Sequence, residues 1–168
     1  AISGQDQNYL ALTQAEVGNY IRSKVSYTDV QGTFETVTSE KSVYKVANLD
    51  DAPTGGVSLS GEAVEDKVLV ASYDTLADED GLGALSLQWQ FEAQNGVWTD
   101  LSGETDGQIS LDDVHVGKSI RALASYTDGE GTYTEVASSG TRRVENLNDL
   151  PTGALKVDGN FEEGSILR

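Results

Sequence analysis

Short runs of alternating apolar and polar residues recur along this chain, and no stretch carries a sustained apolar period of 3.6 residues. The clearest run is residues 85–91. Its apolar face consists of Leu85, Leu87, Trp89 and Phe91. Gly, Asp and Asn turns bound these runs, as is typical of β-strands. The same pattern predicts further strands at residues 68–73, 96–99, 108–111, 119–126 and 132–136.

The chain contains an internal repeat. When residues 2–39 are laid over residues 101–138 at a shift of 99, 15 of the 38 pairs are identical. After one deletion the shift becomes 98, and Asn48 falls on Asn146. Because half a sandwich exposes an unpaired sheet edge, we interpret the chain as a piece of a longer array. The predicted parts are the C-terminal portion of one repeat with its linker at 1–52, a complete repeat at 53–150, and the start of a third at 151–168.

Around seven strands in about 98 residues predict an all-β fold of tandem immunoglobulin-like Greek-key β-sandwich repeats. Trp89, midway along the third strand, is expected in the core because three other apolar residues share its face. For Tyr126, near the following corner strand, we expect a local hydrogen bond. An exposed Trp89 on which a sugar ring stacks is the alternative.

Composition narrows the classes of function. Twenty-eight acidic residues against eleven basic ones give a net charge of -17, which repels nucleic-acid phosphates and anionic membranes and attracts small cations. No apolar run approaches the roughly 18 residues that a membrane span needs, so neither nucleic-acid binding nor membrane insertion is expected. The N-terminus lacks the features of a signal peptide, so we expect export to be directed by sequence outside this piece. With no Cys, disulfides cannot stabilise the fold.

Three segments carry a family resemblance: DTLADEDGLGALSLQWQ at 74–90, DVHVGK at 113–118 and SYTDGEGT at 125–132. They resemble the immunoglobulin-like or cadherin-like repeats of long bacterial surface adhesins of the RTX type, and the resemblance covers essentially the whole chain. Such repeats form an extended spacer, the extender region. The resemblance implies export to the cell surface and calcium binding at or near the junctions between repeats.

The two junctions are rich in oxygen ligands. The segment 146–151 is similar to the acidic linker, ending in Asx-Asp-x-Pro, that joins cadherin repeats. Oxygen donors at alternate positions of an extended linker suit Ca²⁺, which takes six to eight oxygens at about 2.3–2.6 Å. The segment 48–53 repeats the pattern. The alternative is that Asn-Asp-x-Pro is ordinary turn chemistry.

Other acidic residues are expected to join the junction sites. Asp128 and Glu130, in the turn between the last two strands, are predicted at the pole that faces the next repeat, while Glu65 opens a repeat at its start. The loop 78–81 begins like a calcium loop but lacks the bidentate Glu of an EF-hand. It either forms a loop site with Asp74, contributes to a junction, or is a solvated hairpin. The full set of candidate calcium ligands is Asp29, Asn48, Asp50, Asp51, Glu65, Asp74, Asp78, Asp80, Asp128, Glu130, Asn146, Asn148, Asp149 and Glu163.

The sequence offers little for an enzyme, and none is predicted. His115 is the only histidine, and the earlier copy has Glu16 in its place, so no His-based triad recurs. The pair Asp112 and Asp113 has the composition of a glycosidase dyad, but a repeat sandwich offers no evident deep cleft. The glycines of residues 81–83 do not lead from a strand into a helix, as a phosphate loop requires.

These observations predict a structural extender of a secreted or surface-bound bacterial adhesin, with neighbouring repeats of the same chain as its partners. Other domains would contact the cell-surface or matrix ligand in adhesion or biofilm formation. One alternative is a module that binds carbohydrate or protein through its loops or an exposed aromatic face. The second is a subunit of an extracellular filament that associates with itself.

Overall fold

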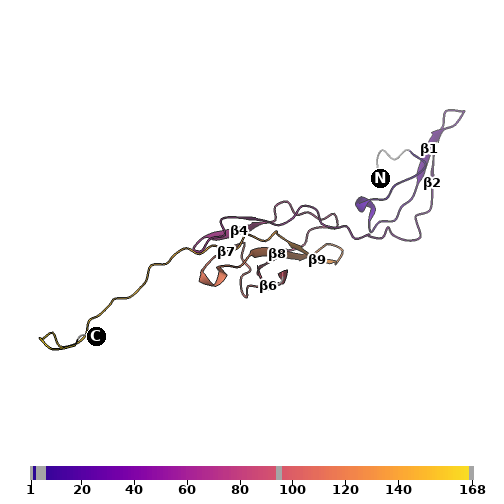
Figure 1. Cartoon of the computed structure of the whole chain (residues 1–168). Helices are drawn as coiled ribbons and strands as arrows, with labels where there is room; N and C mark the ends of the chain where they lie inside the picture. The colour runs from indigo at the N-terminus through magenta and orange to yellow at the C-terminus, as the bar shows by residue number, and fades with distance from the viewer. Residues whose placement is uncertain (1, 3–6, 94–95, 167–168) are drawn as a thin grey trace.

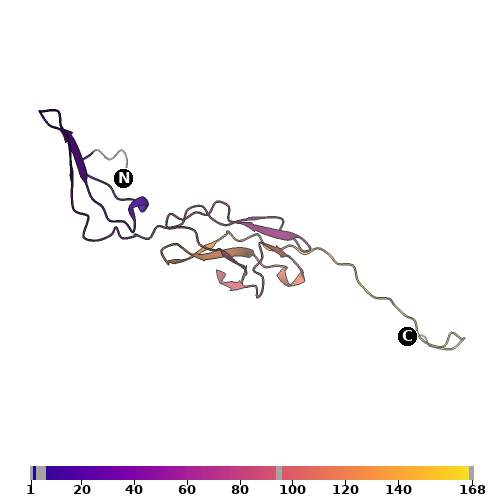
Figure 2. The same ribbon diagram turned by 180° about the vertical axis from the view of Figure 1, so that it is seen from behind.

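The computed structural model describes residues 2, 7–93 and 96–166. Along the chain, a hairpin segment at one end leads into a compact body of β-sheets, which is followed by an extended C-terminal segment (Figure 1). The view from behind shows the same elongated arrangement (Figure 2). The described part is all-β, with antiparallel sheets and only short 3₁₀ turns as helical structure, consistent with a β-sandwich.

Among the described residues, seven strands form the two sheets of the compact body, and six of them coincide with strands that the sequence pattern named. The three-stranded sheet has the order β3-β4-β7, with β3 at Ser58–Ser60, β4 at Val68–Ser72 and β7 at Gln108–Ser110. The four-stranded sheet has the order β6-β5-β8-β9, with β6 at Trp98–Asp100, β5 at Ser86–Glu92, β8 at Ile120–Thr127 and β9 at Tyr133–Ala137. The alternation did not predict β3, whose three residues include one apolar side chain.

The core lies between these sheets and is centred on Trp89. Its side chain is fully buried, and its indole Nε1 donates a hydrogen bond to the carbonyl oxygen of Asp106 at 2.8 Å. The prediction of a core tryptophan is therefore confirmed. Leu87 and Phe91, from the same face of β5, pack against the buried cluster. The buried members are Ala63, Leu69, Ala71, Trp89, Ile109, Leu111, Ile120, Ala122 and Val144.

Tyr126 is also buried, but its hydrogen bond is not local. The phenolic oxygen donates to Oδ2 of Asp78 at 2.6 Å, across 48 positions of the chain. Burial, together with the hydrogen bond to Asp78, raises the pKa of Tyr126 to about 12. The expectation of a local partner is wrong because β8 ends beside the loop that follows β4, so residues distant in sequence meet there.

The hairpin segment repeats the local structure of the compact body. The 3₁₀ helices η1, at Gln14–Glu16, and η3, at Asp113–His115, lie 99 residues apart, and each begins with a capping box. The hairpin of β1 (Lys24–Thr28) and β2 (Phe34–Thr38) has the register of β8 with β9: Val25 pairs with Val37 as Ala124 pairs with Val136. The sequence repeat is therefore also a repeat of structure in these segments.

The two copies differ in burial. Val25 is 61% exposed on β1, whereas its counterpart Ala124 on β8 is fully buried.

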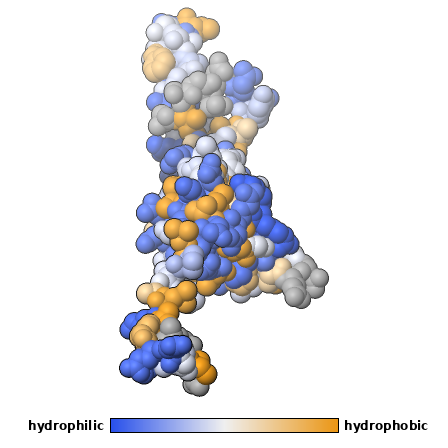
Figure 3. Space-filling model, turned by 60° about the vertical axis from the view of Figure 1, so that its left-hand side comes forward, coloured by the Kyte–Doolittle hydropathy of each residue, from blue (hydrophilic) through white to orange (hydrophobic). Residues whose placement is uncertain are grey.

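The surface of the molecule is mostly polar on the face drawn in Figure 3. Hydrophilic residues predominate over its middle, with small hydrophobic groups between them. Within the described residues, no helix has the length and apolar character that crossing a membrane requires.

Candidate metal centres

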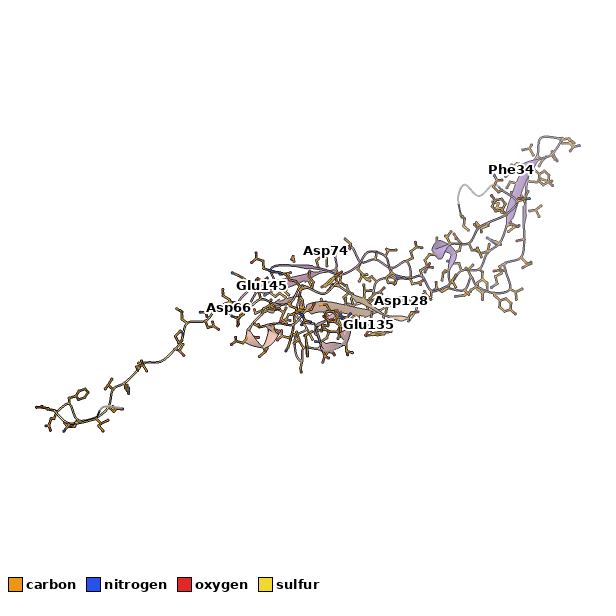
Figure 4. The ribbon with its side chains drawn as sticks, viewed as in Figure 1. Phe34, Asp66, Asp74, Asp128, Glu135 and Glu145 are labelled. Atoms are coloured by element: carbon orange, nitrogen blue, oxygen red, sulfur yellow. The ribbon has the colours of Figure 1, made fainter. Side chains whose placement is uncertain are left out.

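Two carboxylate triads lie at opposite ends of the compact body. Asp50, Asp80 and Asp128 form the entry triad, because Asp50 belongs to the linker through which the chain enters this body. Glu65, Asp113 and Asp149 form the exit triad, with Asp149 in the departing linker. In each triad, one carboxylate oxygen per residue lies within 4.8 Å of the others. In Figure 4, Asp128 marks the end facing the hairpin segment, and Asp66 and Glu145 mark the opposite end.

Close backbone packing brings the entry triad together. The turn after β8 lies against the loop after β4, and the Gly129 amide donates to the carbonyl oxygen of Asp80 at 3.0 Å. A side chain at position 129 would not fit, because its Cβ would stand 2.6 Å from that same oxygen. Gly129 therefore allows the approach that places the buried carboxylates of Asp80 and Asp128 side by side.

Backbone amides hold the Asp128 carboxylate in its ionised form. Its Oδ1 accepts hydrogen bonds from the N–H groups of Glu130, Gly131 and Thr132, at 2.9, 2.6 and 2.8 Å. Burial acts to raise the pKa of Asp128, but these donors outweigh it and lower the pKa below its ordinary value. The entry triad thus presents an anionic carboxylate at neutral pH.

Donors from both sides of the linker also reach Asp80. The backbone N–H of Asp51 donates to Oδ2 of Asp80, and the side-chain Nε2 of Gln14 donates to Oδ1, both at 2.8 Å. Gln14 belongs to the hairpin segment, 66 positions earlier in the chain. The entry triad therefore lies where the two segments touch.

A short parallel bridge and a 3₁₀ helix position the exit triad. Val64 pairs with Glu145, and the Glu65 amide donates to the Glu145 carbonyl oxygen at 2.9 Å. The linker then turns so that the backbone N–H of Leu147 donates to Oε2 of Glu65 at 2.9 Å. Asp113, the first residue of η3, supplies the neighbouring carboxylate.

Glu65 carries an unfavourable negative charge in this arrangement. A hydrogen bond shared with Asp113 raises its pKa, the Leu147 amide lowers it, and burial together with the charges of Asp113 and Asp149 raises it again. The pKa of Glu65 is therefore above its ordinary value, although the backbone N–H of Leu147 acts to lower it. A divalent cation would relieve this repulsion more effectively than a proton.

The poles of the body are the reverse of those expected from the sequence. Asp128 and Glu130 were expected to face the next repeat, but Asp128 meets Asp50 of the incoming linker. Glu65, expected at the start of the repeat, meets Asp149 of the outgoing linker. Because β9 carries the chain away from the Asp128 turn before it leaves, the turn and the outgoing linker lie at opposite poles.

Several other predicted ligands lie outside both triads. Asp78 accepts hydrogen bonds from the Tyr126 hydroxyl and from the Asp80 amide, which gives it a structural role. Asp74 is exposed and accepts a hydrogen bond from the Ser72 hydroxyl. Asp29 accepts the backbone N–H groups of its own turn, as Asp128 does. The exposed residues Asp51, Glu130, Asn146, Asn148 and Glu163 are likewise members of neither triad.

Asn48 is different, because its side-chain Oδ1 is buried and accepts no hydrogen bond from any described residue. A buried carbonyl oxygen without a donor is costly unless a cation or water fills the place. Asn48 lies two positions before Asp50 of the entry triad. The missing partner of this oxygen is therefore either a water molecule or a cation.

The sequence argument did not include Asp113 or Gln14 in a junction. Asp113 was considered only as half of a glycosidase dyad with Asp112, yet Asp112 caps η3 and its amide donates to Nδ1 of the buried His115 at 3.1 Å. The available signal was the repeat itself, which sets Gln14 on Asp113 at the shift of 99.

Comparison with known proteins adds no relative: no family model, curated protein or solved structure matches this chain.

Proposed function

We propose that this chain is a calcium-stiffened extender segment of a secreted or cell-surface bacterial adhesin. The observation that carries the proposal is the placement of the two carboxylate triads, one at each end of a single body, each combining a linker aspartate with carboxylates of that body. In an elongated chain of repeats, such ends are the places where one repeat meets the next (Figure 1). The partners are accordingly the neighbouring repeats, and adhesion itself is assigned to other domains.

The proposed fold is an immunoglobulin-like or cadherin-like Greek-key sandwich. Three features support it: sheets of order β3-β4-β7 and β6-β5-β8-β9, a buried tryptophan on β5, and a segment after β3 that crosses to pair in parallel with the chain after β9. With an odd number of strands, the chain enters at one pole and leaves at the other. This geometry suits a repeat that is linked end to end.

The repeat relates the two triads to each other. Asp149 of the exit triad corresponds to Asp51 at the shift of 98, next to Asp50 of the entry triad. Each triad is therefore one half of the same type of junction, seen from the repeat before it or from the repeat after it. The preceding repeat supplies the positions of Glu65 and Asp113, and the following repeat supplies those of Asp80 and Asp128.

A junction assembled in this way offers the chemistry of a calcium site. All of its ligands are oxygen atoms, mostly carboxylates, which is the set that calcium prefers and transition metals do not require. When bound, calcium would supply positive charge that holds the linker carboxylates together. Asp50, Asp80 and Asp128 would hold it at entry, and Glu65, Asp113 and Asp149 at exit.

Calcium is expected to raise the melting temperature of the chain. If free calcium exceeds the dissociation constant tenfold, binding stabilises the folded state by roughly 1.4 kcal/mol per site. For a domain of this size, that corresponds to an increase of about 6–11 °C per occupied site. Thermal unfolding followed by circular dichroism, in calcium and in a chelator, measures the difference.

Magnesium at the same concentration is the control for ionic strength and for unspecific charge screening. Mg²⁺ keeps its waters and demands near-ideal octahedral geometry, so we expect a smaller increase than with calcium. Equal melting temperatures in calcium and chelator would contradict the proposal. Equal increases in melting temperature with both ions would mean that the ions only screen the net charge of -17.

A further inference from the structure

The first residue of the short 3₁₀ helix differs between the two copies of the repeat. In the hairpin segment it is Gln14, and in the compact body it is Asp113. Both helices have a capping box, and the following glycines, Gly18 and Gly117, share a left-handed conformation with φ of 74° and 76°. The backbone therefore presents the two side chains from equivalent places, and their chemistry is the difference.

Gln14 makes a contact that an aspartate cannot make. Its Nε2 donates to Oδ1 of Asp80 at 2.8 Å, while the Asp51 amide donates to Oδ2 at the same distance. Asp80 is 6% exposed, so the two oxygens of a buried carboxylate accept hydrogen bonds from the linker and from the hairpin segment beyond it. These hydrogen bonds connect the hairpin segment, the linker and the compact body without an ion.

In the exit triad, the corresponding place is taken by Asp113, whose side chain carries a carboxylate instead of an amide. An ionised aspartate only accepts hydrogen bonds, so Asp113 adds negative charge beside Glu65 and Asp149. Gln14 thus attracts a carboxylate of the following body, whereas Asp113 repels the carboxylates of Glu65, in its own body, and Asp149, in the linker.

We infer that the residue at the start of this 3₁₀ helix decides whether a junction is held together by direct hydrogen bonds or requires a cation. With Gln14, the junction at the entry triad keeps its order without calcium through the Gln14–Asp80 bond. With an aspartate, as at position 113, the junction depends on calcium. The calcium half of this inference rests on the proposed function, and the hydrogen-bonded half does not.

Distances between two spin labels test the inference on the intact chain. Since the sequence contains no Cys, labels can be attached at Lys24→Cys on β1 and Thr99→Cys on β6, two exposed positions on either side of the junction. In chelator, the chain with Gln14 should give a narrow distance distribution. Gln14→Ala should lose the narrow component in chelator, because the donor to Asp80 is gone.

Two further variants separate the donor from the shape of the side chain. Gln14→Glu keeps the length of the side chain but replaces its N–H groups with charge, so it should also lose the narrow component in chelator. Gln14→Asp should be broad in chelator and narrow again in calcium. Gln31→Asp is the matched control, since Gln31 lies in the exposed turn between β1 and β2, and it should leave the distribution unchanged.

The outcomes distinguish the inference from the proposal on which it rests. Equal distributions for the parent chain and Gln14→Ala in chelator would overturn the hydrogen-bonded junction. If those two differ but Gln14→Asp stays broad in calcium and calorimetry detects no calcium binding, the proposed function fails and the hydrogen-bonded junction stands. If calcium binds but does not narrow the Gln14→Asp distribution, the assignment of this position as the deciding residue is overturned.

Discussion

Glu65→Gln is expected to stabilise the chain in chelator and to weaken calcium binding at the exit triad by at least about tenfold. Between the ordinary glutamate pKa and the raised pKa of Glu65, the native state holds a proton on this side chain that the unfolded chain has released. Stability without calcium therefore falls as pH rises from the ordinary glutamate pKa through the raised one. Glutamine resembles the protonated form and removes this loss at pH 7, but it gives calcium a weaker ligand.

Melting temperatures of the variant and the parent chain, each in calcium and in chelator at pH 7, measure both effects. In chelator, the variant should melt at a higher temperature than the parent chain. Calcium should raise the melting temperature of the variant less than that of the parent. Glu62→Gln is the matched control, because Glu62 is exposed and belongs to neither triad. A variant that melts lower in chelator, or that gains as much from calcium as the parent does, would contradict the assignment of Glu65.

Acidification should act in the same direction as this substitution. Between neutral pH and the ordinary glutamate pKa, protonation of Glu65 adds stability in chelator and competes with calcium when the ion is present. Asp128 contributes in a separate window, because its lowered pKa makes its stabilisation disappear only as pH falls below the ordinary aspartate range. The two groups can therefore be resolved in a pH series.

Trp89→Ala should destabilise the compact body by about 3–5 kcal/mol, a large part of the roughly 5–15 kcal/mol that stabilises a typical domain. The side chain is fully buried, and its removal leaves both a cavity and the Asp106 carbonyl oxygen without its donor. Since both triads are positioned by this one core, calcium binding at both ends should weaken with it. Urea unfolding followed by circular dichroism gives the change in free energy.

Trp98→Ala provides the comparison within the same chain. Trp98 is half-buried on β6, where the guanidinium of Arg121 lies 4.3 Å from its ring centroid. Losing this cation–π contact should cost about 1 kcal/mol. If both tryptophan variants lost similar stability, the core would not be centred on Trp89.

Local features of the fold were predictable from the sequence. Alternation along residues 85–91 placed Trp89 in the core, and the shift of 99 anticipated that β1 and β2 share the register of β8 and β9. The first signal is an apolar side chain at every second residue, and the second is the similarity in sequence between the two repeats. The structure also brings Asp50, Asp80 and Asp128 together, all three of which were candidate ligands.

The poles were not predicted, and one short strand explains much of the error. In β3, Leu59 is the single apolar residue between Ser58 and Ser60, so no alternation marked the strand. Without it, Glu65 was placed at the start of the repeat, whereas β3 has already carried the chain to the opposite pole. Asp113 was missed for another reason: its role depends on meeting Glu65 across 48 residues, and sequence spacing does not reveal such a contact.

Calorimetric titration of the chain with calcium, in two buffers of different ionisation enthalpy, tests the central claim most directly. The account predicts saturable binding, with a dissociation constant of about 10⁻⁴–10⁻³ M, as is usual for extracellular modules. At a pH just above the ordinary glutamate pKa, where the raised pKa of Glu65 favours its protonated form, the apparent enthalpy should also depend on the buffer, because calcium displaces that proton. Glu65→Gln should abolish this dependence on the buffer. Titrations that show only the heat of dilution would contradict the claim that the triads hold calcium.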